Sequence, residues 1–292
     1  MNHIPRNYKE ALASPEAKFW LNAIKDELSA QIKNHTWTYV RKDKVSKNSK
    51  FVKIIDSRWV FTKKDLPDGS TKFKARLVIK GFQDTNNYDY SETYAPVAGL
   101  MEVHAFFALA NKRNWDIFQM DVSMAFINSE LSKKVLMKVP DGLEVSKEFR
   151  ENHVCLVERA LYGLRTSPKR WWLHFRDVMV KMGLQVYENQ TCLFYWTRPA
   201  RTHEQESQVT YVLLYVDDIL ATGNCKEKIR ETRNRLDCIF EMKNIGEPKK
   251  FIGLEITRDR KRSILKLTQT KLIDSIILKF GLYGVRPVNT PF

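Results

Sequence analysis

Two adjacent acids, Asp217 and Asp218, interrupt the apolar segment VTYVLLYVDDILAT of residues 209–222. Strand-forming β-branched and aromatic residues flank the pair, so the segment predicts a β-hairpin with the acids at its bend. Ionised carboxylates are costly to remove from water, and beside an apolar hairpin they need cations, hydrogen-bond donors or water. A metal site is one interpretation. The alternative is a solvated turn, because Asp is an ordinary turn former.

A third acid, Asp121, lies in the strand-like segment WDIFQMDVSMAF. In a strand, Phe118, Met120 and Val122 share one face, and Asp121 points to the opposite face. If that opposite face borders a cleft, Asp121 meets the acids of the hairpin in space. A single Asp in a strand is more often simply exposed, so the pattern alone leaves both interpretations open.

Charge and composition indicate the kind of partner. The chain has 292 residues and a net charge of +15, and residues 41–80 hold 13 Lys or Arg against 4 Asp or Glu. This excess predicts a polyanionic partner, with nucleic acid the first hypothesis and an acidic membrane surface the second. The sequence has neither an apolar run of about 20 residues nor a signal peptide, which predicts a soluble intracellular protein. Cys and His spacing argues against a zinc site and a disulfide framework.

Two N-terminal elements are predicted from local signals. Ser14 and the following Pro and Glu indicate the start of a helix, with Ser14 as its N-cap. Residues 58–80 predict a hairpin around a Pro-Asp-Gly turn. In its second strand Lys74 and Arg76 share one face with other lysines, so they form either a solvated face or a cationic surface that grips phosphates.

Further along the chain, glycine and proline signals separate mixed helices and strands. A strand runs into a turn at Gly163, a loop containing Arg165 follows, and Pro168 begins a helix that ends near Gly183. A basic helix, a second hairpin and a last helix come after the acid pair. This mixture predicts an α+β protein.

Seven segments then carry a family resemblance. They are RWVFTKK, KARLVIKGFQ, DYSETYAPV, MDVSMAF, LYGLRTSPKRWW, YVLLYVDDIL and KKFIGLEI. In this order they resemble the motifs of the reverse transcriptase domain of Ty1/copia-type retrotransposon Pol polyproteins, over nearly the whole chain. The resemblance implies a right-hand polymerase fold, with fingers, a palm built on an antiparallel sheet, and a partial thumb. We expect one domain over 1–292, with fingers in 15–100, mainly palm in 101–245, and the palm end and partial thumb in 246–292.

The resemblance also implies the chemistry, RNA-directed DNA polymerisation. Asp121, Asp217 and Asp218 would be catalytic and, with the Val122 carbonyl, would bind two Mg²⁺ ions, for which Mn²⁺ is an alternative. Such ions lower the pKa of the primer 3′-hydroxyl and neutralise the leaving pyrophosphate. A lysine such as Lys249 would protonate the pyrophosphate.

Other residues are assigned to the nucleotide by the same resemblance. Lys74 and Arg76 would hold the triphosphate, and Phe126 would lie under the sugar and disfavour ribonucleotides. The loop of residues 163–168, with Gly163, Arg165 and Pro168, would support nucleotide and template. The chain has SMAFINS where the family commonly has KTAFLNG, and LRTSP where it often has LKQAP. We expect these differences to tune activity.

The expected partners are an RNA or DNA template with its primer and deoxynucleoside triphosphates, without a membrane. Protease, integrase and ribonuclease H are expected on a full polyprotein, and a cytoplasmic particle is expected for the parent element. Because those parts are absent and the tail RPVNTPF ends abruptly, a truncated remnant that only binds nucleic acid is the first alternative. An unrelated metal-dependent phosphotransferase is the second.

Overall fold

The computed structural model describes residues 3–46, 53–65, 69–188, 190–200, 202 and 206–286. The chain divides into two compact units. Unit 1 comprises Met1–Pro96 and Met124–Met182, and unit 2 comprises Val97–Ser123 and Gly183–Phe292. Among the described residues, no helix has the length and apolar character needed to cross a membrane.

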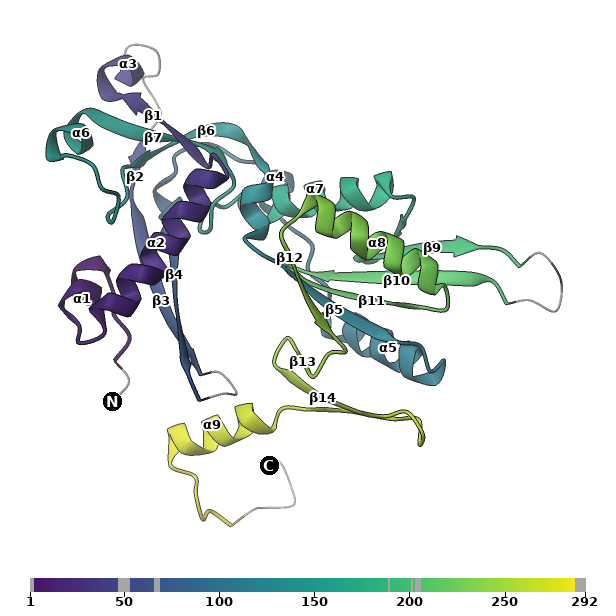
Figure 1. Cartoon of the computed structure of the whole chain (residues 1–292). Coiled ribbons are helices and arrows are strands. Elements are labelled where there is room, and N and C mark those ends of the chain that lie inside the picture. The colour runs from purple at the N-terminus through teal and green to yellow at the C-terminus, as the bar shows by residue number, and fades with distance from the viewer. Residues whose placement is uncertain are drawn as a thin grey trace. The chain divides into compact units, whose positions relative to one another are not determined.

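Unit 1 contains a four-stranded sheet of order β1-β7-β6-β2 (Figure 1). Its strands are β1 (Trp37–Arg41), β2 (Ile54–Ile55), β6 (Glu130–Lys138) and β7 (His153–Arg159). The helices of unit 1 are α1 (Tyr8–Ala13), α2 (Ala17–Lys33), α3 (Lys42–Ser46), η1 (Gly81–Gln83), α4 (Tyr90–Thr93), η2 (Ala125–Asn128), α6 (Lys147–Asn152) and α7 (Ser167–Lys181). The expected N-cap at Ser14 is wrong. Ser14 ends α1, where its hydroxyl donates to the Ala11 carbonyl, and Glu16 precedes α2.

A separate two-stranded sheet in unit 1 is the hairpin of β3 (Ser57–Asp65) and β4 (Thr71–Ile79). The predicted hairpin is thus confirmed, although residues 66–68 of its turn lie outside the described residues. Helix α2 packs against β4, where the rings of Trp20 and Phe73 meet edge to face at 4.7 Å.

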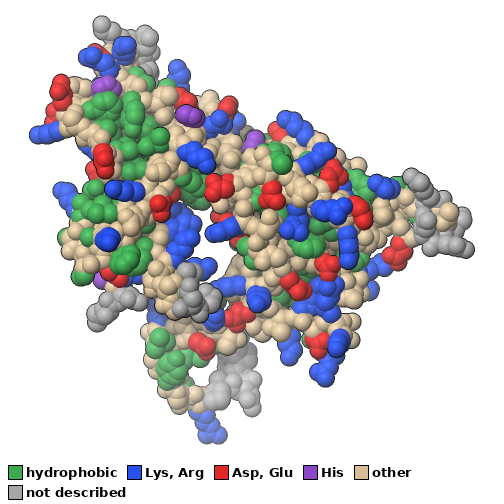
Figure 2. Space-filling view, in the orientation of Figure 1, with side chains coloured by type: hydrophobic (Ala, Val, Ile, Leu, Met, Phe, Trp, Pro, Cys, Tyr) green, Lys and Arg blue, Asp and Glu red, His purple; other side chains and the backbone are tan. Residues whose placement is uncertain are grey.

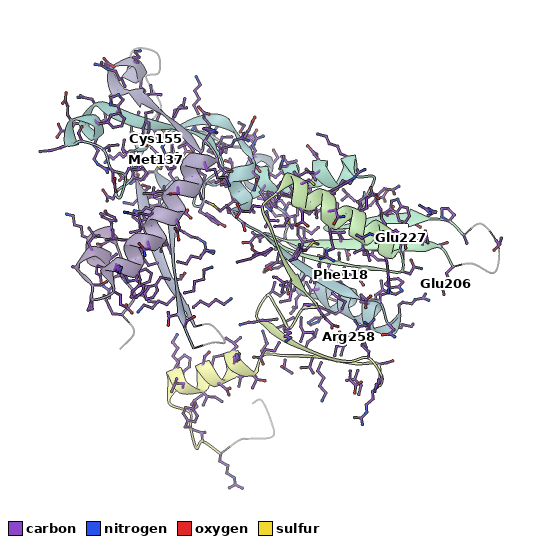
Figure 3. The ribbon with its side chains drawn as sticks, in the orientation of Figure 1. Phe118, Met137, Cys155, Glu206, Glu227 and Arg258 are labelled. Atoms are coloured by element: carbon purple, nitrogen blue, oxygen red, sulfur yellow. The ribbon has the colours of Figure 1, made fainter. Side chains whose placement is uncertain are left out.

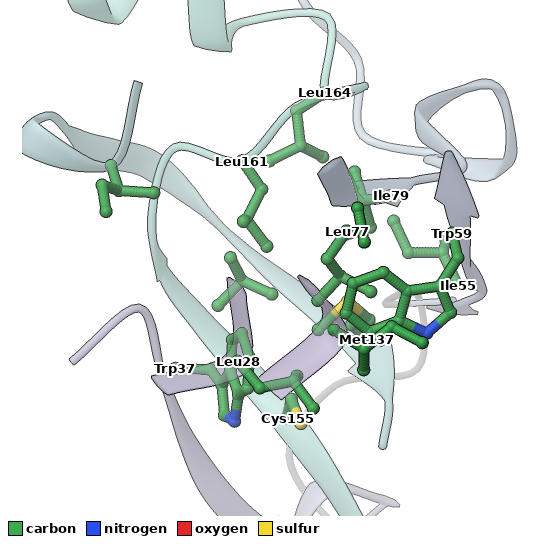
Figure 4. Close-up of a cluster of buried hydrophobic side chains, with 14 of the residues drawn as sticks. Leu28, Trp37, Ile55, Trp59, Leu77, Ile79, Met137, Cys155, Leu161 and Leu164 are labelled. Atoms are coloured by element: carbon green, nitrogen blue, oxygen red, sulfur yellow. The ribbon is translucent and has the colours of Figure 1, made fainter. Parts of the chain in front are cut away.

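The core of unit 1 lies between this hairpin, α2 and the four-stranded sheet. Because side chains alternate along a strand, Leu77 and Ile79 of β4 enter the same core (Figure 4). Met137 of β6 and Cys155 of β7 are fully buried in the cluster. The apolar side of α2, with Trp20, completes it.

Unit 2 is built on a six-stranded antiparallel sheet of order β12-β5-β11-β10-β9-β8. Its strands are β5 (Ile117–Val122), β8 (Gln185–Tyr187), β9 (Gln190–Arg198), β10 (Gln208–Tyr215), β11 (Asp218–Gly223) and β12 (Met242–Gly246). Helix α8 (Lys226–Ile239) lies along one side of this sheet (Figure 1). On that side, the Arg233 guanidinium lies 4.8 Å from the Phe118 ring.

The rest of unit 2 is a three-stranded sheet with two helices. Its elements are α5 (Leu100–Lys112), β13 (Lys250–Phe251), β14 (Leu254–Asp259), β15 (Ile264–Thr268) and α9 (Thr270–Phe280). Arg258 of β14, labelled in Figure 3, donates to the carbonyls of Ala110 (3.1 Å) and Trp115 (2.8 Å). Ala110 lies in the last turn of α5 and Trp115 follows the end of the helix, so Arg258 caps α5 through the Ala110 carbonyl and fixes this part of the chain to β14.

The structure confirms the predicted α+β class and the antiparallel sheet that carries the acid pair. The bend between β10 and β11 contains Val216 and Asp217, and Asp218 already belongs to β11. On the face shown in Figure 2, Lys and Arg side chains lie among acidic ones on both units. The division into the ranges 15–100, 101–245 and 246–292 stays a prediction.

Candidate active site

Three acids meet at one end of the large sheet of unit 2. In the register of β5 and β11, Asp121 lies directly opposite Asp218. Opposed residues of an antiparallel pair project from the same face, so these two carboxylates share a face. Asp217 lies in the adjoining turn, and its backbone carbonyl accepts a 2.9 Å hydrogen bond from the Val122 amide. The structure therefore brings together the acids and Val122, whereas their catalytic and metal-binding roles stay predictions.

The surroundings of Asp218 oppose the ionisation of its carboxyl group. Burial raises the pKa of Asp218, and the negative charges of Asp217 and Asp121 raise it further. The Gln119 side-chain amide opposes this by donating to Asp218 Oδ1 at 3.2 Å. A bound cation would relieve the repulsion, and carboxylate oxygens are ligands that Mg²⁺ accepts.

The carboxylate oxygens of the three acids are therefore chemically suited to a hard divalent cation. The part of the chain that the structure describes contains no group of three His, Cys, Asp or Glu side chains already arranged to hold a metal ion. All three acids are half-buried, which leaves part of each side chain in contact with solvent. The three acids are therefore open to solvent, and a metal-binding role for them stays a prediction.

The raised pKa of Asp218 predicts a stability gain on neutralisation. A carboxyl group whose pKa is raised on folding binds its proton more tightly in the folded state, so its ionised form destabilises the fold above that pKa. Asp218→Asn should therefore raise the melting temperature at pH 7 in the presence of a chelator. The gain should shrink as the pH falls through the folded-state pKa toward the ordinary carboxyl range, and thermal unfolding at several pH values would measure it. Asp274→Asn, at an exposed position of α9, is the control; an equal gain there would contradict the explanation.

The turn between β10 and β11 also holds a strained residue. Val216 has a positive φ of 58°, in the left-handed region that β-branched residues strongly disfavour. Such a conformation costs roughly 1–2 kcal/mol for a non-glycine residue. Asn tolerates it, so Val216→Asn should increase the free energy of unfolding by about 1 kcal/mol in urea titrations. The same substitution at Val209, a half-buried position within β10, should give no gain.

One basic residue beside the acids was missed in the sequence. Lys243 of β12 lies opposite Asp121 on the side of β5 away from β11. Its side chain is exposed and projects from the face that carries the acids. The sequence had favoured Lys249, whose role stays a prediction. Only the pairing of β12 with β5 reveals Lys243.

In unit 1, two of the predicted nucleotide-binding residues form one aromatic cluster. The Arg76 guanidinium lies 5.7 Å from the centre of the Tyr162 ring. The Tyr162 ring in turn packs on Phe126, with 4.7 Å between ring centres. Tyr162, which precedes Gly163, was not predicted, although it lies between Arg76 and Phe126. The position of Tyr162 immediately before Gly163, in the predicted nucleotide-binding loop, was a sequence signal that could have identified it.

The remaining predicted residues are also in unit 1. Lys74 is exposed on β4, next but one to Arg76 along the chain. Arg165 is exposed in the loop before α7, and Pro168 lies in the first turn of that helix. Gly163 has a positive φ of 96° and touches the end of β4. The nucleotide-binding candidates thus belong to unit 1, and the acids belong to unit 2.

Comparisons with known proteins give a consistent result. A family model described as reverse transcriptase (RNA-dependent DNA polymerase) matches residues 34–292. The chain is 35% identical over 288 residues to the retrovirus-related Pol polyprotein from transposon RE1 of Arabidopsis thaliana. It is 31% identical over 290 residues to the one from transposon TNT 1-94 of Nicotiana tabacum. Each match covers 98% of this chain but 18% and 21% of the relatives, so the chain spans about a fifth of their length.

A solved structure of a foamy viral protease-reverse transcriptase in complex with double-stranded DNA is also similar. It aligns with a TM-score of 0.41 and 13% identity. The alignment covers 91% of this chain and 37% of that chain.

Proposed function

Because the chain belongs to the reverse transcriptase (RNA-dependent DNA polymerase) family, we propose that it adds deoxynucleotides to the 3′-hydroxyl of a primer on an RNA template. The relatives that it matches over 98% of its length include retrovirus-related Pol polyproteins from the transposons RE1 and TNT 1-94. The observation that carries the proposal is the pairing of Asp121 with Asp218, with Asp217 in the adjoining turn. Acids from two distant segments meet at one place, as catalysis by a carboxylate cluster requires.

The acids of unit 2 are proposed to hold divalent metal. Asp121 and Asp217, with the Val122 carbonyl, are the proposed ligands, and Asp218 assists beside them. Magnesium bound there would lower the pKa of the primer hydroxyl and neutralise the charge of the leaving pyrophosphate. Lys243 of β12, which lies opposite Asp121 on the same face of the sheet, would stabilise negative charge on the phosphates.

The residues of unit 1 are proposed to bind the incoming deoxynucleotide. Lys74 and Arg76 pair with the triphosphate, since both are basic and lie on one face of β4. Phe126 limits the space at position 2′ of the sugar. The loop with Gly163, Arg165 and Pro168 supports the base and the template, and the ring of Tyr162 holds Arg76 and Phe126 together.

The partners of a complete polyprotein are part of the proposal. We propose that the chain works with a primed RNA or DNA template and deoxynucleoside triphosphates, and that ribonuclease H, integrase and protease accompany it in a longer polyprotein. A cytoplasmic particle is the proposed location of the parent element.

A primer-extension assay tests the function. The purified chain is incubated with a primed RNA template, the four deoxynucleotides and Mg²⁺, and extended primers are expected. Omitting Mg²⁺ should prevent extension, and Mn²⁺ should restore part of it. Salt-sensitive binding of the primed template without product would instead support a remnant that only binds nucleic acid. Hydrolysis of small phosphate esters without any response to the template would support a phosphotransferase.

A further inference from the structure

Strand β4, which carries Lys74 and Arg76, pairs with β3 along one edge only. Strand β3 occupies one edge of β4, and the amides of Leu77 and Ile79 point from the other. Buried backbone amides need acceptors, and an open strand edge invites slippage or wrong pairing. Two acceptors meet this need: Glu27 Oε1 accepts from the Leu77 amide at 3.2 Å, and the Tyr162 carbonyl accepts from the Ile79 amide at 2.8 Å.

Glu27 differs from the other residues on the packed side of α2 because it is an acid that faces β4. Its Oε1 accepts a second hydrogen bond, at 3.0 Å, from the side-chain amide of Gln31, a residue with no solvent exposure. Burial raises the pKa of Glu27. Two effects lower the pKa in part: the hydrogen bonds from Gln31 and Leu77, and the positive charges of Lys74 and Arg76. An apolar residue here would avoid the cost of burying a carboxylate. The packing of α2 alone therefore gives no reason for an acid at this position.

The position of the hydrogen bond between the Leu77 amide and Glu27 explains why an acid is present there. Leu77 directly follows Arg76 in β4, and the Ile79 bond lies two residues further on. Arg76 also rests against the ring of Tyr162, whose own carbonyl receives the Ile79 amide. Along the edge away from β3, the backbone that aims Arg76 is thus tied both to α2 and to the loop before α7.

We infer that Glu27 is a positioning residue, which fixes the edge of β4 and so aims Arg76 at the phosphates of an incoming nucleotide. The inference rests on the proposed function, because it assigns Arg76 a nucleotide ligand. Glu27 itself touches neither substrate nor reacting atoms. It acts through the backbone of β4, and an acceptor oxygen at this position is what the role requires.

Steady-state primer extension with varied dATP separates this role from a merely structural one. Glu27→Ala removes the acceptor and should raise KM for dATP about five- to tenfold, while kcat changes less than about twofold. Glu27→Gln keeps an oxygen that accepts from Leu77 and should restore KM to within about twofold of the unchanged chain. Asp26→Ala, at the neighbouring exposed position of α2, is the matched control and should leave both constants unchanged.

Amide hydrogen exchange at Leu77 gives a readout that needs no activity. Exchange should accelerate at least about fivefold in Glu27→Ala and stay slow in Glu27→Gln and Asp26→Ala. Unchanged exchange in Glu27→Ala would overturn the inference. So would accelerated exchange with an unchanged KM, because the bond would then be structural only. An equal rise of KM in Glu27→Ala and Glu27→Gln would also overturn it, because charge and not the acceptor would then matter.

The same experiments distinguish this inference from the proposed function. If the unchanged chain fails to extend primers, the proposed function is contradicted, while exchange at Leu77 still decides whether Glu27 fixes β4. If the unchanged chain extends primers and Glu27→Ala behaves like Asp26→Ala, only the role of Glu27 is contradicted.

Discussion

Asp217→Asn is expected to abolish primer extension while primer–template binding stays largely intact. The substitution keeps the size of the side chain but removes its negative charge, and a neutral amide is a poor ligand for a hard divalent cation. Asp217 lies in the turn that hydrogen-bonds to the Val122 amide, next to the opposed pair Asp121 and Asp218. We expect a loss of roughly 10³-fold in kcat, as when a charge-stabilising group is removed from an active site. Gel-based primer extension and filter binding of the same primed template would measure the two properties.

The control for this prediction is Asp274→Asn, which removes one negative charge from an exposed position of α9. This variant should extend primers like the unchanged chain. Extension retained by Asp217→Asn would refute the assigned role of Asp217. A parallel loss of template binding would show that Asp217 serves folding or binding, and not the chemical step.

Features that depend on local alternation could be predicted from the sequence. The hairpin of β3 and β4 follows from a turn signal between two alternating segments, and it is confirmed. The hairpin at Asp217 and Asp218 follows from the same kind of pattern, and it is also confirmed. Alternation also placed Asp121 opposite the apolar face of β5. In each case the period of two along a strand determines which side chains share a face.

Features that depend on pairing between distant segments could not be predicted. The place of Lys243 beside Asp121 depends on the register of β12, which contains an irregularity between Asn244 and Gly246. A shift of one residue would turn the Lys243 side chain to the other face. Tyr162 was missed for a similar reason, because its neighbours Arg76 and Phe126 come from separate elements. No local period contains that information.

The predicted N-cap at Ser14 was wrong because two local signals compete at this residue. Ser14 precedes a proline and an acid, which is typical of the start of a helix. In the structure the same residue ends α1, a short helix that the sequence analysis did not predict. A Ser hydroxyl can accept from amides at the start of a helix or donate to a carbonyl at its end. The hydrogen bond to the Ala11 carbonyl shows which use prevails.

The largest stability effect is expected from Gly163→Ala. A Cβ atom at Gly163 would lie 2.1 Å from the Ile79 carbonyl oxygen and 2.8 Å from a methyl group of Val78. Its positive φ of 96° adds backbone strain for any residue with a Cβ. The backbone of β4 cannot yield without loss of the 2.8 Å bond from the Ile79 amide to the Tyr162 carbonyl. We therefore expect the free energy of unfolding to fall by about 4 kcal/mol, measured by urea titration.

Gly183→Ala separates overlap from backbone strain, because Gly183 also has a positive φ, 81°, but no atom within 4 Å of an added Cβ. That variant should lose only about 1 kcal/mol. An equal loss in the two variants would show that φ alone explains the effect and that the contact with β4 contributes nothing. Amide exchange at Ile79 should accelerate in Gly163→Ala and stay unchanged in Gly183→Ala. The resemblance assigned Gly163 to the nucleotide, whereas its contact with β4 makes it necessary for the strand that carries Arg76, even without any nucleotide.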